Sequence, residues 1–216
     1  MPGPSSPTIC LVMIMRDEAH IVTETLESVL PWIDTWSIVD TGSTDGTQQV
    51  VTEFFARAGV PGTLHERPWV GFAANRSEAL DLARGTADYS FMMDADDLLV
   101  GTPDLTDLHA HGYVLRLIGD GVTYWRTQLF AQSMHWEYRG AVHEYAYCPD
   151  LPTPPPRIDG DYRIEVRHLG DRNVRGDKYD RDTALLRAEL DADPDDSRTV
   201  FYLAQTRLHD GDPQEA

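Results

Sequence analysis

Residues 36–47 have the sequence WSIVDTGSTDGT, which we interpret as a strand, a polar turn and the start of a helix. The predicted strand, 36–40, is short and apolar and ends in the carboxylate Asp40. A helical pattern continues to about Ala58, and Ser43 or Thr44 is placed to cap it. A buried strand followed at once by a helix is the repeating unit of a parallel α/β sheet.

The same alternation extends on both sides of this unit. Apolar runs at 8–14, 63–66 and 89–93 predict three more strands, and helical spacing predicts helices over 18–30 and 73–83. Strands separated by helices of this length favour βαβ units. We therefore predict an α/β fold whose sheet is mainly parallel.

After residue 97 the pattern changes. Two strand-like runs, 113–118 and 122–130, flank Gly119-Asp120-Gly121, which is typical of an antiparallel hairpin. A proline-rich loop at 149–156 precedes one more predicted strand at 162–168. The sheet is thus expected to be mixed.

The last part of the chain has a helical pattern. Amphipathic segments at 178–190 and 197–209, with a turn at 211–216, resemble the first part of a tetratricopeptide repeat, whose period is about 34 residues. We predict an α/β domain over 1–176 and a partial helical repeat over 177–216, available for protein contacts. A partial repeat cannot bury its own apolar face, so we expect the sequence to be part of a longer protein.

Composition excludes several classes of partner. The formal net charge is −18, from 36 acidic and 18 basic residues. This balance disfavours nucleic acid, which is held by lysines and arginines, and an anionic membrane surface. The sequence shows no membrane span and no secretory signal, so a cytoplasmic location is expected. The two cysteines, Cys10 and Cys148, are predicted to be structural.

Three carboxylates follow the predicted strand at 89–93, in the sequence DADD at 94–97. The carboxyl ends of strands are where open α/β sheets bind ligands. Asp94 and Asp96 could face one hard cation, which prefers oxygen ligands and could in turn hold a diphosphate. The alternative is an acidic loop that caps a helix.

Other polar residues follow neighbouring strands. Asp17 and Glu18 come after the first predicted strand, and Asp40 after the second. Asp40 could accept a hydrogen bond from a base or a ribose, or act only as a cap. Asn75-Arg76 opens the third helix, where Arg76 could meet a base or a phosphate, or be an ordinary surface arginine.

These motifs resemble those of family 2 glycosyltransferases of the GT-A fold. The resemblance rests on 13–19 (MIMRDEA), 38–47 (IVDTGSTDGT) and 94–96 (DAD), in the order found in that family. More narrowly, the chain is similar to the branch with C-terminal tetratricopeptide repeats, which includes S-glycosyltransferases of bacteriocin peptides. The resemblance implies a Rossmann-like domain, a nucleotide-sugar donor (UDP-sugar favoured), Mn²⁺ or Mg²⁺, and a peptide, glycan or small-molecule acceptor.

The resemblance also implies roles for single residues. Asp40 matches the nucleoside contact, while Asp94 and Asp96 match the pair around ribose, metal and diphosphate. His168, at the end of the last predicted strand, is the candidate third metal ligand, with a structural histidine as the alternative. Two departures from the family are Asp17, where relatives usually have asparagine, and Asn75-Arg76, where many reverse the order and leave open which residue acts.

A second block, WEYRGAVHE at 136–144, resembles the Gly-x-Val-His-Glu motif of the repeat-bearing branch. Inverting transfer needs a base that takes the acceptor proton. We assign Glu144 to that role, with Asp97 as the next candidate, and expect His143 to help bind donor phosphate or acceptor. The alternative is a structural His–Glu pair.

Two other functions compete with sugar transfer. The acidic triplet would suit a metal-dependent nucleotidyl or phosphoryl transferase, but nucleotidyltransferases usually have a glycine-rich loop and a lysine where this chain has Arg16-Asp17-Glu18. A degenerate, non-catalytic transferase could serve as a repeat-bearing scaffold. Retention of Asp40, Asp94, Asp96 and Glu144 together argues against that decay.

Overall fold

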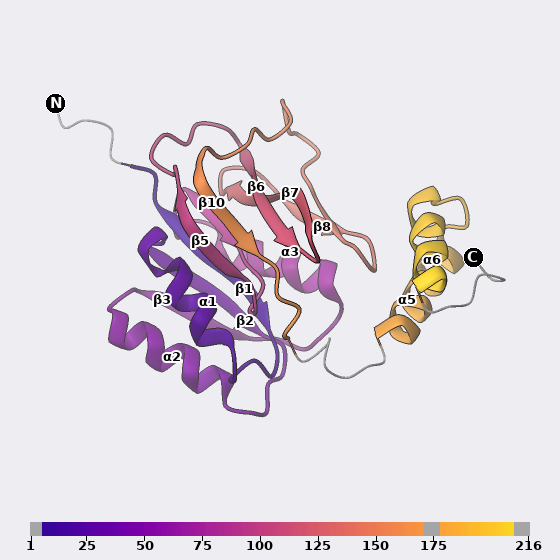
Figure 1. Ribbon diagram of the computed structural model, residues 1–216, viewed down its shortest axis with the longest axis horizontal. Coiled ribbons are helices and arrows are strands. Elements are labelled where there is room, and N and C mark those ends of the chain that lie inside the picture. Colours follow the sequence, from indigo (N-terminus) through magenta and orange to yellow (C-terminus); the bar gives the residue numbers. More distant parts are fainter. Residues whose placement is uncertain (1–5, 171–177, 210–216) are drawn as a thin grey trace.

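The computed structural model describes residues 6–170 and 178–209. An eight-stranded mixed sheet forms the centre of the molecule and is flanked by helices, while a pair of helices lies to one side (Figure 1). In chain order the elements are β1 (Ile9–Met15), α1 (Val22–Val29), the short 3₁₀ helix η1 (Leu30–Trp32), β2 (Thr35–Asp40), α2 (Thr47–Ala58), β3 (Gly62–Glu66), α3 (Phe72–Ala83), β4 (Tyr89–Met92), β5 (Leu98–Pro103), β6 (Gly112–Gly119), β7 (Val122–Ala131), β8 (Glu137–Arg139), β9 (Tyr145–Tyr147), β10 (Gly160–Glu165), α5 (Lys178–Ala192) and α6 (Ser197–His209).

The first half of the chain forms the parallel part of the sheet. The strand order is β3-β2-β1-β4-β7-β6-β10-β5, and β1 pairs in parallel with β2 and β4, while β3 extends the row beyond β2. Antiparallel pairs join β4 to β7, β6 to β7 and β10 to β5. The predicted mixed, mainly parallel α/β sheet is therefore confirmed.

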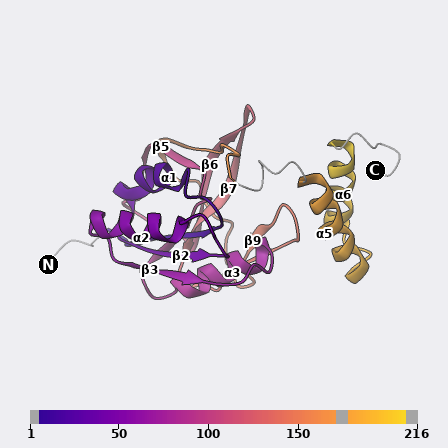
Figure 2. The ribbon, with the colours of Figure 1, turned by 90° about the horizontal axis from the view of Figure 1, so that it is seen from below.

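Both faces of the sheet are covered, as Figure 2 shows from below. Along the fully buried β1, side chains alternate between the two faces. Leu11 and Met13 pack in the core beneath α1 and α2, whereas Cys10 and Val12 pack with α3 on the opposite face. This double burial explains why β1 is a continuous apolar run. Cys10 and Cys148 are both buried free thiols, as predicted.

The start of α2 differs from the prediction. The helix begins at Thr47 after the N-cap residue Gly46, whose φ is 91°, and the Asp45 carboxylate accepts from the Thr47 amide at 3.0 Å. The prediction of a Ser43 or Thr44 cap was wrong because both residues are used inside the loop. Ser43 Oγ donates to Asp40, and the Thr44 amide donates to Asp17 at 2.7 Å.

The second half contains both a confirmed and a missed feature. The predicted hairpin of β6 and β7 is present, and Asp120 and Gly121 at its turn have φ of 51° and 77°, the left-handed values that a tight two-residue turn needs. The edge strand β5 and the small β8–β9 ladder were not predicted. β8 and β9 have three residues each, and β5 includes a glycine and a proline, which weaken a strand pattern.

The helical segments at the end of the described chain are confirmed as α5 and α6. Asp196 caps α6 by accepting from the Arg198 amide at 3.0 Å and from Thr199 Oγ1 at 2.6 Å. The predicted domain boundary at 176/177 and the predicted turn at 211–216 lie outside the described residues. None of the described helices is long and apolar enough to cross a membrane.

Candidate active site

A cleft of about 400 Å³ opens at the carboxyl ends of β1 and β4. This is the edge at which open α/β sheets bind ligands, because the loops that follow the strands converge there. Its charged and titratable lining comes from six segments of the chain. These residues are Arg16, Glu18, Arg76, Asp94, Asp96, Asp97, Tyr124, Arg126, His168 and Arg181.

Asp94, the first residue of the acidic triplet, is neutralised by two arginines. Its carboxylate accepts hydrogen bonds from Arg76 and, at 3.3 Å, from Arg126. Burial alone would raise the pKa of Asp94, but the two guanidinium groups outweigh burial and hold that pKa below its usual value. Asp94 is thus a charged anchor between α3 and β7.

Asp96 ties the triplet to the segment that follows β10. Its Oδ2 accepts from the amides of Leu169 and Gly170, both at 2.8 Å, and its carbonyl accepts from Arg167 at 2.6 Å. His168 therefore lies beside the triplet and lines the cleft, but its Nε2 lies 3.2 Å from Asp120 Oδ2. Its φ of 55° is unusual for a residue other than glycine.

Asp97 is the buried member of the triplet, with 1% of its surface exposed. Burial first, and then the neighbouring Asp94 carboxylate, raise the pKa of Asp97 to about 8, against the opposing effect of Arg126. Its Oδ2 has no hydrogen-bond partner among the described residues. An orphaned carboxylate oxygen in an acidic cluster fits a bound cation, which would satisfy that oxygen and favour its charged form.

The predicted metal ligands Asp94, Asp96 and His168 come close together in the fold but bind different partners. Within 6–170 and 178–209, no three histidine, cysteine, aspartate or glutamate side chains form a ready-made metal cluster. The acidic oxygens fit a hard cation in chemistry. To bind a cation, Asp94 would therefore have to loosen its bonds to arginine, and Asp96 its bonds to backbone amides.

Arg76 is the central cation of the site and is only 9% exposed. Its guanidinium bonds both Asp94 and Glu144. The rings of Phe72 and Tyr138 each lie 5.7 Å from it. Burial would lower the pKa of Arg76, but the two carboxylates raise it above its usual value.

The neighbouring Asn75 has a different task. Its Oδ1 accepts from the amides of Val70 and Gly71, at 2.9 and 3.2 Å, and its Nδ2 donates to the carbonyl of Pro68. Asn75 therefore shapes the loop before α3, whereas Arg76 lines the cleft.

Glu144 lies in the loop between β8 and β9, and its side chain is 11% exposed. Arg76 links Glu144 to Asp94. The two predicted motifs, 94–97 and 136–144, therefore meet at one guanidinium group. Glu144 and His143 are not among the described residues that line the cleft. The His143 ring instead stacks on Tyr202 of α6, with ring centroids 4.4 Å apart.

Asp40 and Asp17 hold the two loops beside the cleft. Asp40 is 1% exposed and accepts from the amides of Gly42 and Ser43, at 3.0 and 2.9 Å, and from Gln48 Nε2. Asp17 has a φ of 56° and accepts from the amide of Thr44. Asparagine and aspartate both tolerate this left-handed backbone. The aspartate at position 17 is therefore compatible with the same loop conformation as the asparagine expected from the family resemblance.

Asp40→Ala is expected to lower the free energy of unfolding by about 1–3 kcal/mol, because buried loop amides lose their acceptor. Asp40→Asn keeps one carbonyl oxygen and should lose less. Urea unfolding followed by tryptophan fluorescence measures both. Equal stability of Asp40→Ala and wild type would show that Asp40 does not stabilise the loop.

The sequence analysis did not single out three residues that line the cleft, Trp69, Phe72 and Arg181. Trp69 and Phe72 form an edge-to-face pair, with centroids 4.7 Å apart, at the rim beside α3. Arg181 reaches the cleft from α5. An exposed tryptophan just before a helix was the one available hint for the first pair, while Arg181 depends on how α5 is placed.

Sequence comparison finds a match over part of the chain. Residues 10–108 match the profile described as "Glycosyl transferase family 2". A TPR repeat-containing protein of Synechococcus elongatus is 35% identical over 98 residues, which cover 45% of this chain and 23% of that protein. The chain thus spans about a quarter of the length of this curated relative.

Structure comparison extends over nearly the whole chain. A mannosyltransferase from Pyrobaculum calidifontis, in complex with GDP-Man and Mn²⁺, aligns with a TM-score of 0.58 at 16% identity, covering 96% of this chain and 74% of that one. TarS 1-349 of S. aureus in complex with UDP aligns with a TM-score of 0.50 at 14% identity, covering 92% and 70%. At these identities the likeness shows a shared fold, and the predicted GT-A fold is confirmed.

Proposed function

We propose that the cleft transfers a sugar from a nucleotide diphosphate sugar to an acceptor with the help of a divalent cation, as the match of residues 10–108 to the profile of glycosyl transferase family 2 supports. The observation that carries the proposal is the acidic triplet 94–97, at the end of β4 in a cleft of about 400 Å³. A small pocket with a few convergent charged groups is what a nucleotide sugar requires.

The cation follows from the charge of the protein and of the site. A chain with a net charge of −18 repels a diphosphate, and Arg76 is already paired with two carboxylates. We infer that Asp96 and Asp97, with Asp94 and His168 beside them, hold Mn²⁺ or Mg²⁺. When bound, such a cation would supply positive charge that stabilises the leaving diphosphate.

The donor nucleotide is proposed from related structures as well as from the site. TarS binds UDP and the mannosyltransferase binds GDP-Man, so relatives of this fold take either base. We favour UDP, with the loops of Asp17 and Asp40 on the nucleoside side of the cleft. Asp40 would then act in part through the loop that it holds.

The acceptor side is assigned to Glu144. In the proposed inverting reaction, the acceptor oxygen or sulfur attacks the anomeric carbon, the bond to the diphosphate breaks, and the acceptor proton passes to Glu144. Arg76 holds the Glu144 carboxylate in place through their ion pair. Asp97, the alternative base, is itself one of the proposed cation ligands.

A donor screen tests this function. We expect the protein to release nucleoside diphosphate slowly from one UDP- or GDP-sugar when Mn²⁺ or Mg²⁺ is present, because water can replace the acceptor. Failure with every donor and both cations, in protein shown to be folded, would contradict the proposal and favour a scaffold role.

Metal dependence gives a separate prediction. UDP should bind at least about tenfold more tightly with Mn²⁺ than without it, since the cation would offset the negative charge of both the carboxylates and the diphosphate. Asp96→Asn should lose most of this gain, whereas Asp104→Asn, on a loop elsewhere, should keep it. Calorimetry measures both, and equal UDP affinity with and without metal would contradict the prediction.

A further inference from the structure

The loop that carries Glu144 is contacted by the helical pair through hydrogen bonds. We call residues 140–145 the Glu144 loop. The Ala141 amide donates to the Glu189 carboxylate of α5, at 3.1 and 3.2 Å to its two oxygens. Arg198 of α6 donates from Nη2 to the His143 carbonyl at 2.6 Å. Both helices therefore bond to the backbone of this loop.

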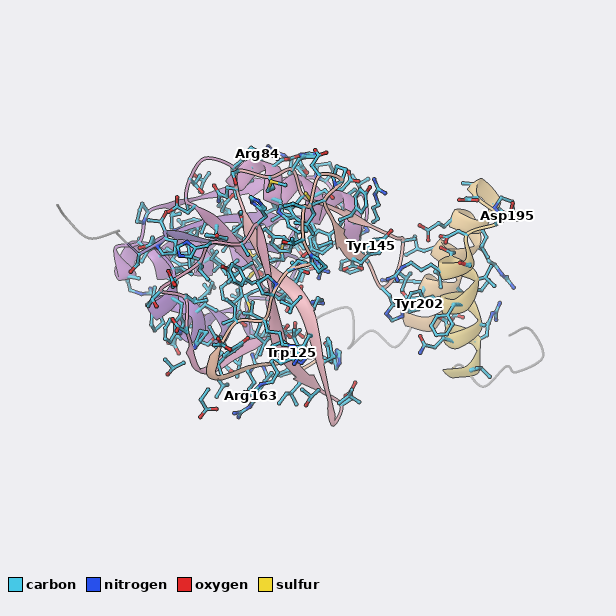
Figure 3. All side chains as sticks on the ribbon, turned by 90° about the horizontal axis from the view of Figure 1, so that it is seen from above. Arg84, Trp125, Tyr145, Arg163, Asp195 and Tyr202 are labelled. Carbon is cyan, nitrogen blue, oxygen red and sulfur yellow. The ribbon has the colours of Figure 1, made fainter. Side chains whose placement is uncertain are left out.

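Aromatic stacking reinforces the same junction. The Arg198 guanidinium lies 4.5 Å from the Tyr145 ring and 4.8 Å from the Tyr202 ring. The His143 ring stacks on Tyr202 with an interplanar angle of 23°. Figure 3 shows Tyr145 and Tyr202 facing each other across the junction. The residues on both sides of Glu144 are thus held by α6.

The backbone of the loop needs such support. Gly140 has a φ of 99° and His143 a φ of 55°. A histidine in the left-handed region is less stable than in ordinary conformations and persists where its surroundings hold it. The next residue is Glu144, whose side chain is bonded to Arg76 of α3. The loop is therefore held from α3 on one side and from α5 and α6 on the other.

Glu189 also connects the two helices to each other. Besides the Ala141 amide, its Oε2 accepts from Thr199 Oγ1 of α6 at 2.9 Å. A change in the packing of α5 against α6 would therefore move the Glu189 carboxylate, which accepts the hydrogen bond of the Ala141 amide. The helical pair also reaches the cleft itself, because Leu185 and Arg181 of α5 line it.

We propose that Glu189 and Arg198 are positioning residues that hold Glu144 for proton transfer, so that the helical pair is a working part of the transferase and not a separate appendage. The inference rests on the proposed function, because it takes Glu144 as the base. The two residues act on Glu144 through the loop backbone. Neither needs to touch donor or acceptor.

The first test measures the loop without any turnover. In the full chain, Arg198→Ala and Glu189→Ala should speed hydrogen exchange of the 140–145 amides by about tenfold or more, because local opening becomes easier. Glu189→Gln keeps an acceptor oxygen and should exchange as wild type does. Arg163→Ala, which removes a surface arginine paired with Glu165 far from the junction (Figure 3), is the matched control.

The second test separates positioning from binding. A displaced base should lower kcat for sugar transfer by about 10–100-fold in the two alanine variants. The donor KM and the UDP affinity should stay within about threefold of wild type, because ground-state binding is untouched. Glu189→Gln should restore most of the turnover.

Each result bears on the proposal. Unchanged exchange in both alanine variants would overturn it, and so would faster exchange with unchanged kcat. A raised acceptor KM at constant kcat would also overturn it, since the junction would then be a binding surface. Absence of transfer by wild type with every donor would contradict the proposed function instead, and the exchange measurement would still decide whether the helices hold the loop.

Discussion

Replacing Arg76 by methionine should lower the free energy of unfolding by about 3–5 kcal/mol, because it leaves the largely buried Glu144 carboxylate without its counter-charge and leaves Asp94 with Arg126 alone. Arg76 is 9% exposed and bonds Asp94 and Glu144 at once. Methionine fills part of the same volume between the neighbouring aromatic rings but carries no charge. Urea unfolding at neutral pH, followed by tryptophan fluorescence, measures the loss.

Two further variants separate charge from packing. Arg76→Lys keeps the charge, but a single ammonium group cannot bridge two carboxylates as a planar guanidinium does, so a partial loss is expected. The double variant Arg76→Met with Glu144→Gln removes one of the stranded charges and should be more stable than Arg76→Met alone. Strict additivity of the two single changes would contradict an energetic link between Arg76 and Glu144.

The parallel half of the fold could be predicted because its strands are buried on both faces. Such strands stand out as continuous apolar runs, and the helices between them show a clear helical period. The edge strand β5 and the ladder of β8 and β9 could not be predicted. β8 and β9 have only three residues each, and the pairing of β5 depends on β10, which is distant in sequence.

The position of the site could also be predicted, since polar residues at strand ends must gather at one edge of a parallel sheet. Asp94, Asp96, Arg76 and His168 do lie along one cleft. Their pairing could not be predicted, because side-chain partners depend on orientation. Asp94 bonds arginines and Asp96 bonds backbone amides, although the i and i+2 spacing alone suggests one shared ligand.

The link between the helical pair and the Glu144 loop lay beyond sequence patterns for a similar reason. Glu189 and Arg198 look like ordinary charged residues on amphipathic helices. Only the placement of α5 and α6 against the loop gives these two side chains a specific partner. Regions predicted as separate units can thus share one set of contacts.

Glu144→Gln should lower the rate of sugar transfer by about 10²–10⁴-fold, the usual cost of losing a general base. Glutamine keeps the shape of the side chain and can still accept a hydrogen bond from Arg76, but it cannot take a proton. Arg76 also retains Asp94 as a charged partner, so the change should disturb the fold little. UDP and Mn²⁺ should therefore bind as they do to wild type.

Transfer rate against pH, with an alcohol acceptor, is the measurement that checks this role. An acceptor thiol, with a pKa of about 8.5, is already partly ionised and would hide part of the effect. Glu137→Gln changes a glutamate of the same small hairpin that pairs with Arg139, and it should transfer at nearly the wild-type rate. Near-normal turnover by Glu144→Gln would rule out Glu144 as the base. Asp97, buried in the proposed cation site, would then be the residue to replace next.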